Sequence, residues 1–270
     1  MHPRPLRLLL FTALGLAGSA AVFAGVAGVA TAATPPQTLR VDYFHTGNAR
    51  EERFALERVV VEPLPWPGDL AKTVDDTNLG KYLFEVIDRS SRRLLYSRGF
   101  ASIYGEWETT GEASEIDRTF SESLRFPCPP LADGPVQVVL KKRDKANDFR
   151  EIWSLVVDPA DMLVDASRPP SAGELIALQR TGDPADKLDF LILGDGYTAA
   201  ERGKCESDAR RLMAILFAVE PFQGRRTDLN VWGLCPAAAE SGISRPSLGI
   251  HRRPPAGSTY DAFRSERYIL

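Results

Sequence analysis

The amino-acid sequence predicts an α+β protein of more than one domain: an antiparallel β-sandwich followed by the beginning of an α/β domain. Apolar and polar residues alternate over short runs between residues 39 and 157. A segment rich in Pro and Gly then interrupts this pattern near residues 168–173. Beyond residue 186 the patterns are those of a strand, an amphipathic helix and a second strand, which is the order of a β-α-β unit.

The first 33 residues have the pattern of a secretory signal peptide. A basic start at residues 1–7 precedes an apolar stretch from Leu8 to Ala30, and Ala30-Thr31-Ala32 fits a small-x-small cleavage site. The apolar stretch is long enough to span a bilayer, so an uncleaved membrane anchor is the alternative. We expect cleavage, and therefore an exported protein with no stable membrane span.

Residues 37–158 form the predicted β-sandwich, because seven short runs alternate with turn residues. Residues 88–93 separate two of these runs in the manner of a hairpin connection. The expected strands are residues 39–43, 54–61, 82–87, 94–100, 119–126, 136–140 and 152–157. Residues 159–186 are expected to be an irregular connection to a second domain at residues 187–270.

The second domain is predicted to begin with a strand at Leu188–Leu193, whose apolar run suits burial on both faces. Gly194-Asp195-Gly196 predicts a tight turn, and Thr198 with Glu201 fits a capping box at the start of a helix. That helix is expected to end at Pro221. Its apolar face consists of Cys205, Ala209, Leu212, Leu216 and Val219.

A strand at Asn230–Leu234 completes the β-α-β unit. Two strands and one helix cannot cover both faces of a parallel sheet, and the chain ends on an apolar run. We therefore expect the front part of a longer protein. Cys205 is expected to be a small buried residue of the helix, and a disulfide between Cys205 and Cys235 is the alternative.

Composition excludes several functions. The chain has 33 Lys and Arg against 36 Asp and Glu, which argues against nucleic acid as a partner. Its histidines are His2, His45 and His251, and neither H-E-x-x-H nor G-x-S-x-G occurs. We expect His45 and His251 to be surface residues, and we predict no catalytic and no metal-binding residue in this chain.

Two further motifs have structural interpretations. Gly194-x-Gly196-x-x-Ala199 matches the dinucleotide-binding fingerprint, but Asp195 places a carboxylate where two phosphates would bind, so we predict a turn and no bound cofactor. The acidic residues of the loop at 106–117 match no calcium-binding pattern and are expected to be solvated.

Several longer runs resemble the IgA-peptidase-type metallopeptidases, peptidase family M sixty-four. The first part is similar in residues 43–49, 62–68, 77–82 and 97–110. The second part is similar in residues 193–198, 222–232, 240–242, 257–261 and 265–268. The resemblance implies an exported zinc endopeptidase with a β-sandwich followed by a zincin-like α/β domain. It also implies zinc as the cofactor of the full-length family and a protein or peptide as its substrate.

In that family the H-E-x-x-H helix follows the point at which this sequence stops, so no zinc ligand is assigned here. The resemblance implies that Glu240, Arg245 and His251 lie in the loop that leads toward the cleft, and they are the candidate substrate-cleft residues. The leading hypothesis is the N-terminal fragment of a zinc metalloendopeptidase that is catalytically incomplete in itself. The alternative is a non-catalytic secreted β-sandwich that binds another molecule.

Overall fold

The structure is a computed structural model that describes residues 35–184, 186–266 and 268–270. The predicted signal peptide at residues 1–33 lies outside the described residues. Among the helices that are described, none is both long and apolar enough to cross a membrane.

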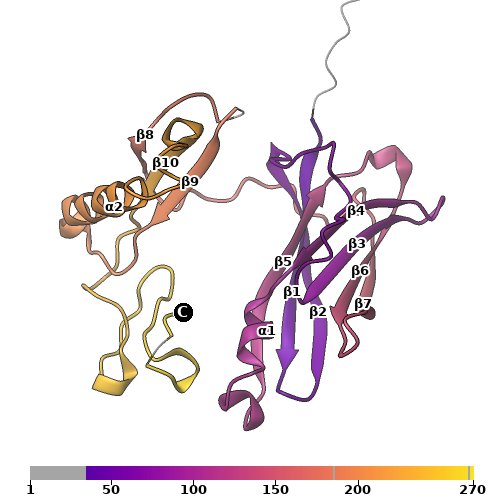
Figure 1. Cartoon of the computed structure of the whole chain (residues 1–270), viewed down its shortest axis with the longest axis horizontal. Helices are drawn as coiled ribbons and strands as arrows, with labels where there is room; N and C mark the ends of the chain where they lie inside the picture. The colour runs from indigo at the N-terminus through magenta and orange to yellow at the C-terminus, as the bar shows by residue number, and fades with distance from the viewer. Residues whose placement is uncertain (1–34, 185, 267) are drawn as a thin grey trace, which may run out of the picture. The chain divides into compact units, whose positions relative to one another are not determined.

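The N-terminal part, residues 37–157, consists of two antiparallel sheets (Figure 1). One has the strand order β2-β1-β5 and the other β4-β3-β6-β7. Their strands are β1 (Gln37–Gly47), β2 (Glu52–Pro65), β3 (Tyr82–Asp88), β4 (Leu94–Phe100), β5 (Arg118–Pro127), β6 (Val136–Arg143) and β7 (Phe149–Val157). All seven predicted strands are present, and the predicted hairpin connection joins β3 to β4.

Both sheets share one apolar core. Leu39, Val41 and Tyr43 alternate along β1 and point into that core, where they meet Val86 of β3 and Val138 of β6. The period-two pattern therefore places one face of each sheet inward. Fully burying a side chain of this size contributes about 1.5–3 kcal/mol, so the shared core accounts for much of the stability of this part.

The acidic loop is solvated only in part: Glu106, Glu115 and Asp117 are exposed as expected, whereas Glu108 and Glu112 are not. It begins in the short helix α1 (Ile103–Trp107), which Ser102 caps by accepting a hydrogen bond from the Gly105 amide at 2.9 Å. Glu112 is buried and accepts two hydrogen bonds from the Arg118 guanidinium, both at 2.9 Å. Glu108 is paired with Lys142 at 2.9 Å. Lys142 lies in β6, so local sequence does not show that it pairs with Glu108.

The C-terminal part, residues 175–270, contains a mixed three-stranded sheet and one longer helix. These elements are β8 (Leu175–Gln179), β9 (Leu188–Leu193), α2 (Arg202–Leu216) and β10 (Leu229–Leu234). β10 lies in the middle, parallel to β9 and antiparallel to β8. The β-α-β unit is confirmed, and the chain as a whole is α+β. β8 is a strand inside the stretch that the sequence predicted to be an irregular connection.

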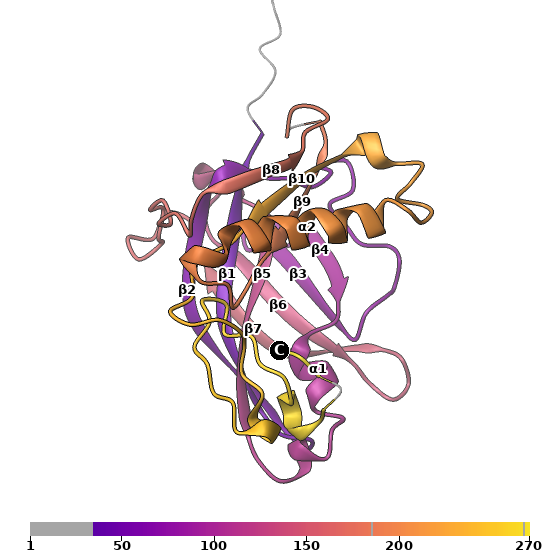
Figure 2. The same cartoon turned by 90° about the vertical axis from the view of Figure 1, so that its left-hand side faces the viewer.

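Helix α2 covers one face of this sheet (Figure 2). Cys205 and Ala209 are buried as predicted, but the buried face continues through Met213 and Phe217. The residues that face the sheet recur every four positions from Cys205, whereas the predicted face alternated steps of four and three. Leu212 and Val219 are therefore turned away from the sheet and are exposed. The helix ends at Leu216, before Pro221.

Strand β9 is not covered on both faces, contrary to the prediction. Ile192 packs toward α2, whereas Leu191 and Leu193 alternate with it and are about half exposed. β9 is also the last strand of the sheet. An apolar run thus predicts a strand correctly without showing how many layers cover it.

We expect limited proteolysis of residues 34–270 to begin in the connection between β7 and β8. Residues 166–174 are all exposed, and Met162 and Leu163 nearby are 94% and 82% exposed. A broad-specificity protease such as subtilisin, followed by mass spectrometry of the first fragments, tests this. Cleavage within the strands of residues 37–157 at the same rate would contradict it.

Candidate functional site

The turn after β9 positions a carboxylate that holds a distant loop. Gly196 has φ +76°, and a Cβ there would lie 2.7 Å from the Gly242 carbonyl oxygen, so the turn requires glycine. Asp195 accepts hydrogen bonds from the amides of Ala256 at 3.0 Å and Ser258 at 3.1 Å. Burial raises the pKa of Asp195, but these hydrogen bonds outweigh it and the net pKa is lowered. The motif is a tight turn, as predicted, and the carboxylate is a structural anchor.

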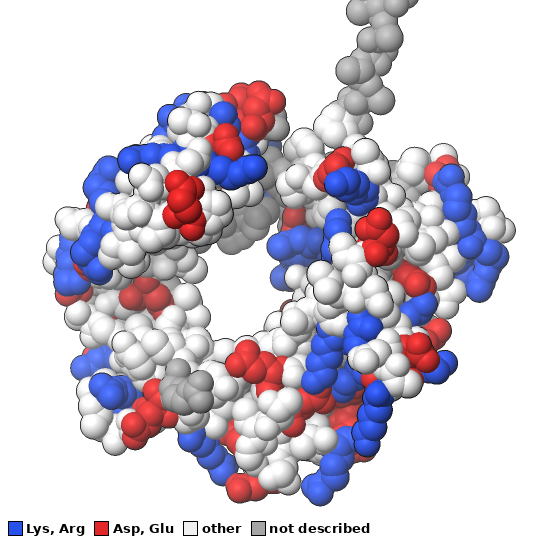
Figure 3. Space-filling view, in the orientation of Figure 1, with Lys and Arg blue, Asp and Glu red and all other residues white. Residues whose placement is uncertain are grey.

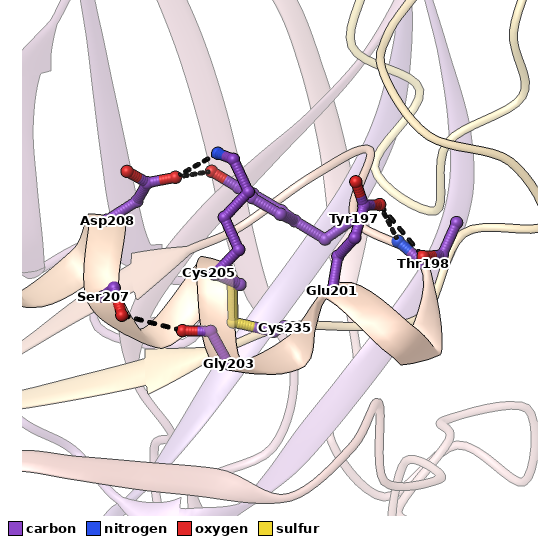
Figure 4. The surroundings of a disulfide bond; sticks show 9 residues. Tyr197, Thr198, Glu201, Gly203, Cys205, Ser207, Asp208 and Cys235 are labelled. Carbon is purple, nitrogen blue, oxygen red and sulfur yellow. Dashed lines mark hydrogen bonds and ion pairs between the residues drawn. A yellow bond between two sulfur atoms is a disulfide. The ribbon is translucent and has the colours of Figure 1, made fainter.

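The start of the helical segment after this turn carries the predicted capping box (Figure 4). The Thr198 amide donates to the Glu201 carboxylate at 2.9 Å. The other oxygen of Glu201 accepts from the Ser241 hydroxyl at 2.9 Å. The cap therefore also ties the loop after β10 to the beginning of the helix.

Cys205 is buried as expected, and it also forms the disulfide with Cys235 that was the alternative. Their Cα atoms are 6.5 Å apart, one on the first turn of α2 and one directly after β10 (Figure 4). Gly194 packs against this disulfide so closely that a Cβ would collide with the Cys205 sulfur. The bond holds the helix, the central strand and the turn together.

A pocket of about 440 Å³ opens beside this turn. Three of its charged side chains are already engaged within the chain: Asp195 and Glu201 as above, and Lys204 with Asp208 at 2.6 Å. The fourth, Arg245, lies over the Tyr260 ring at 5.5 Å. The lining residues are Asp195, Gly196, Tyr197, Glu201, Lys204, Ser241, Gly242, Ile243, Arg245, Ile250 and Tyr260.

The structure brings one of the three predicted cleft residues to this pocket. Arg245 is in its lining, whereas Glu240 is paired with Arg252 at 3.1 Å. His251 is exposed and does not line the pocket. Tyr260 was not predicted; its ring packs against Arg245 from a segment fifteen residues away.

A second polar cluster lies inside the N-terminal part and corrects the expectation that His45 is a surface residue. His45 is 1% exposed. Its Nε2 lies 2.9 Å from a Glu52 oxygen, and its Nδ1 lies 3.1 Å from a Glu122 oxygen. The Tyr104 ring stacks on the imidazole at 3.8 Å.

Both ring nitrogens of His45 face carboxylates, so both must donate a proton and the ring is an imidazolium. Burial lowers the pKa of His45, but the hydrogen bonds to Glu122 and Glu52 outweigh it, and the net pKa is raised. Lys142 adds a second cation, 2.7 Å from Glu52. Lys142 also pairs with Glu108, which Lys81 contacts in turn, so the network holds three cations and three carboxylates. His45 has no free metal-binding nitrogen.

The described residues do not fit a zinc site. Among them, no group of three or more His, Cys, Asp or Glu side chains lies close enough to hold a metal ion. A protein zinc site needs three or four such ligands. Both ring nitrogens of His45 are paired with carboxylates, and Cys205 and Cys235 form a disulfide with each other.

Comparison with known families covers both parts of the chain. Residues 31–154 match Peptidase M64 N-terminus, and residues 176–270 match IgA Peptidase M64. The chain belongs to the M64 IgA peptidase family. No curated protein matches the chain significantly. The pocket beside the Gly194–Gly196 turn lies in the part that matches the IgA peptidase domain, and the His45 cluster lies in the part that matches the family's N-terminal domain.

Proposed function

We propose that this chain is part of an exported IgA-peptidase-like zinc metalloendopeptidase and that residues 34–270 do not cleave peptide bonds by themselves. Membership of the M64 family supports the reaction class, hydrolysis of peptide bonds in a protein or peptide substrate. The two sheets around one core and the β9-α2-β10 unit support the finer assignment to a β-sandwich and a zincin-like α/β domain.

The metal-binding side chains of the chain are the basis for proposing that residues 34–270 do not cleave peptide bonds. Zinc peptidases use a metal with three protein ligands and one open position to activate water. The mature chain has two histidines, and His45 is held by two carboxylates inside the N-terminal part. The family's H-E-x-x-H motif does not occur in the 270 residues. When bound, zinc would polarise the scissile carbonyl, and the described residues supply no set of ligands for it.

The pocket beside Asp195 is the proposed substrate-facing surface of this chain. Arg245 is its proposed substrate-positioning residue, because the other charged residues in the lining hold the chain together. Figure 3 shows acidic and basic side chains interspersed over the face in view, and this pattern gives no support to a nucleic acid partner.

Export of the chain is also part of the proposal. The signal-like start supports it, and so does the disulfide between Cys205 and Cys235, since such bonds persist in oxidising compartments. Expression with the complete N-terminus, followed by fractionation and N-terminal sequencing, tests this. An intact chain in the cytoplasm with reduced cysteines would contradict it.

The catalytic proposal is tested on purified residues 34–270. We expect no stoichiometric zinc after dialysis with the metal and no cleavage of a denatured protein substrate, while an active zinc peptidase cleaves it in parallel. One bound zinc per chain with cleavage that a chelator abolishes would overturn the proposal. Separately, an in-frame H-E-x-x-H in the downstream coding sequence would support the peptidase assignment.

A further inference from the structure

The C-terminal part inserts an aromatic side chain into the N-terminal part. Residues 35–270 form one compact unit, and Phe263 is 6% exposed within it. Its ring lies 6.1 Å from that of Phe120 in β5, in a cluster that also contains Tyr104 and Trp107 of α1. Aromatic rings at this distance and inclination contribute both buried area and favourable ring contacts.

Charged groups surround the same contact. Arg264 forms an ion pair with Glu115 at 2.8 Å and a longer one with Glu112 at 3.5 Å. The Arg118 guanidinium, which is fixed by Glu112, lies 5.7 Å from the centre of the Phe263 ring. An apolar centre with paired charges around it is the usual composition of a specific interface.

The backbone at this contact is held in an unusual conformation. Asp261, Phe263 and Arg264 have φ values of 59°, 55° and 57°. Residues other than glycine seldom adopt positive φ, and a bulky residue such as Phe263 does so least often. The surroundings must therefore hold these residues there. The contacts of Phe263 and Arg264 with the N-terminal part contribute to this, together with the hydrogen bond that the Asp261 carboxylate accepts from the Ser247 amide at 2.9 Å.

The same segment forms one wall of the candidate pocket. Tyr260 directly precedes the strained residues, and its amide donates to the Ser244 carbonyl at 2.8 Å. Arg245 then lies over the Tyr260 ring. A contact that fixes residues 261–264 therefore also fixes where Tyr260 and Arg245 meet.

We propose that the N-terminal part acts as an intramolecular clamp: its aromatic cluster receives Phe263 and thereby positions the Tyr260 wall of the pocket. This assigns the N-terminal part a positioning role, independent of whether the chain belongs to an active peptidase. Phe263 and Arg264 are positioning residues in this arrangement.

Hydrogen exchange of residues 34–270, followed by mass spectrometry, tests the clamp. Phe263→Ala should speed exchange of peptides covering residues 257–270 and 103–120 by roughly tenfold or more, because the contact that protects both is lost. Peptides from α2 and β10 should be unchanged. Phe263→Leu, which keeps an apolar side chain, should restore most of the protection. Unchanged exchange at both segments in Phe263→Ala would overturn the proposal.

Charge reversal provides a second test that does not alter the apolar contact. Arg264→Glu should speed exchange at residues 257–270, and the double variant Glu115→Arg/Arg264→Glu should restore protection. Arg253→Glu makes the same charge change at an exposed arginine and should have no effect. If Phe263→Ala speeds exchange evenly over the whole chain, rescue by the double variant supports the clamp and its failure overturns the proposal.

Discussion

Replacing His45 with Gln is expected to lower the free energy of unfolding of residues 34–270 by about 3–5 kcal/mol, because the change removes one partner of a buried ion network. Glu52 and Glu122 then lose the cation that pairs with both of them. Tyr43 and Tyr82 still donate hydrogen bonds to these carboxylates, at 2.8 and 3.1 Å, but they carry no charge. Urea unfolding at pH 6 measures the loss.

The same network predicts a pH optimum for stability. The pKa of His45 in the folded chain is raised above its ordinary 6.5, so its contribution is complete below pH 6.5 and is lost as pH rises through the folded value. Burial raises the pKa values of Glu52 and Glu122, but the hydrogen bonds with His45 help to lower both below the ordinary 4.5. Their contribution is present above pH 4.5 and is lost on acidification. The network therefore stabilises the fold most between pH 4.5 and 6.5.

The matched control is His251→Gln, which changes an exposed histidine. It should keep the stability and the pH profile of the unaltered chain, whereas His45→Gln should remove most of the decline in stability above pH 6.5. If His45→Gln and the unaltered chain decline alike over that range, the decline does not come from the His45 network.

Local patterns were sufficient to predict much of this fold. The seven strands of the N-terminal part follow from period-two alternation, and the β9-α2-β10 unit follows from a change in period. The capping box of Thr198 and Glu201 was also correct, because it is defined by residues three apart. The alternation even placed His45 in phase with Leu39, Val41 and Tyr43, a signal for burial that the composition argument overlooked.

Features that depend on distant residues were not predicted. The carboxylates that hold His45 come from β2 and β5, and only the sheet pairing brings them together. β8 is short and has no clear alternation, so its pairing with β10 is visible only in the structure. Of the predicted cleft residues, Arg245 reached the pocket because the loop after β10 folds back on Tyr260, a contact that residue spacing does not reveal.

Removing the disulfide is expected to have the second large effect. The bond closes a loop with a sequence separation of 30 residues, for which the chain-entropy estimate of stabilisation is about 3.6 kcal/mol. The double variant Cys205→Ala/Cys235→Ala should lose stability of that order in the C-terminal part. It should also speed hydrogen exchange at the start of α2, at the end of β10 and in residues 256–258. The last segment is affected because Asp195, in the turn that packs on the disulfide, accepts hydrogen bonds from the amides of Ala256 and Ser258.

Cys128→Ser is the matched control, since Cys128 is the free and half-buried cysteine of the N-terminal part. Treatment of the unaltered chain with a reductant should speed hydrogen exchange in the same segments as the double variant does. The strands around His45 should stay protected, because Cys205 and Cys235 both lie in the C-terminal part. Equal exchange in the oxidised and reduced chains would show that the disulfide adds nothing to the turn. In that case hydrogen bonds such as those of Asp195 and Glu201 would be sufficient to hold the pocket wall.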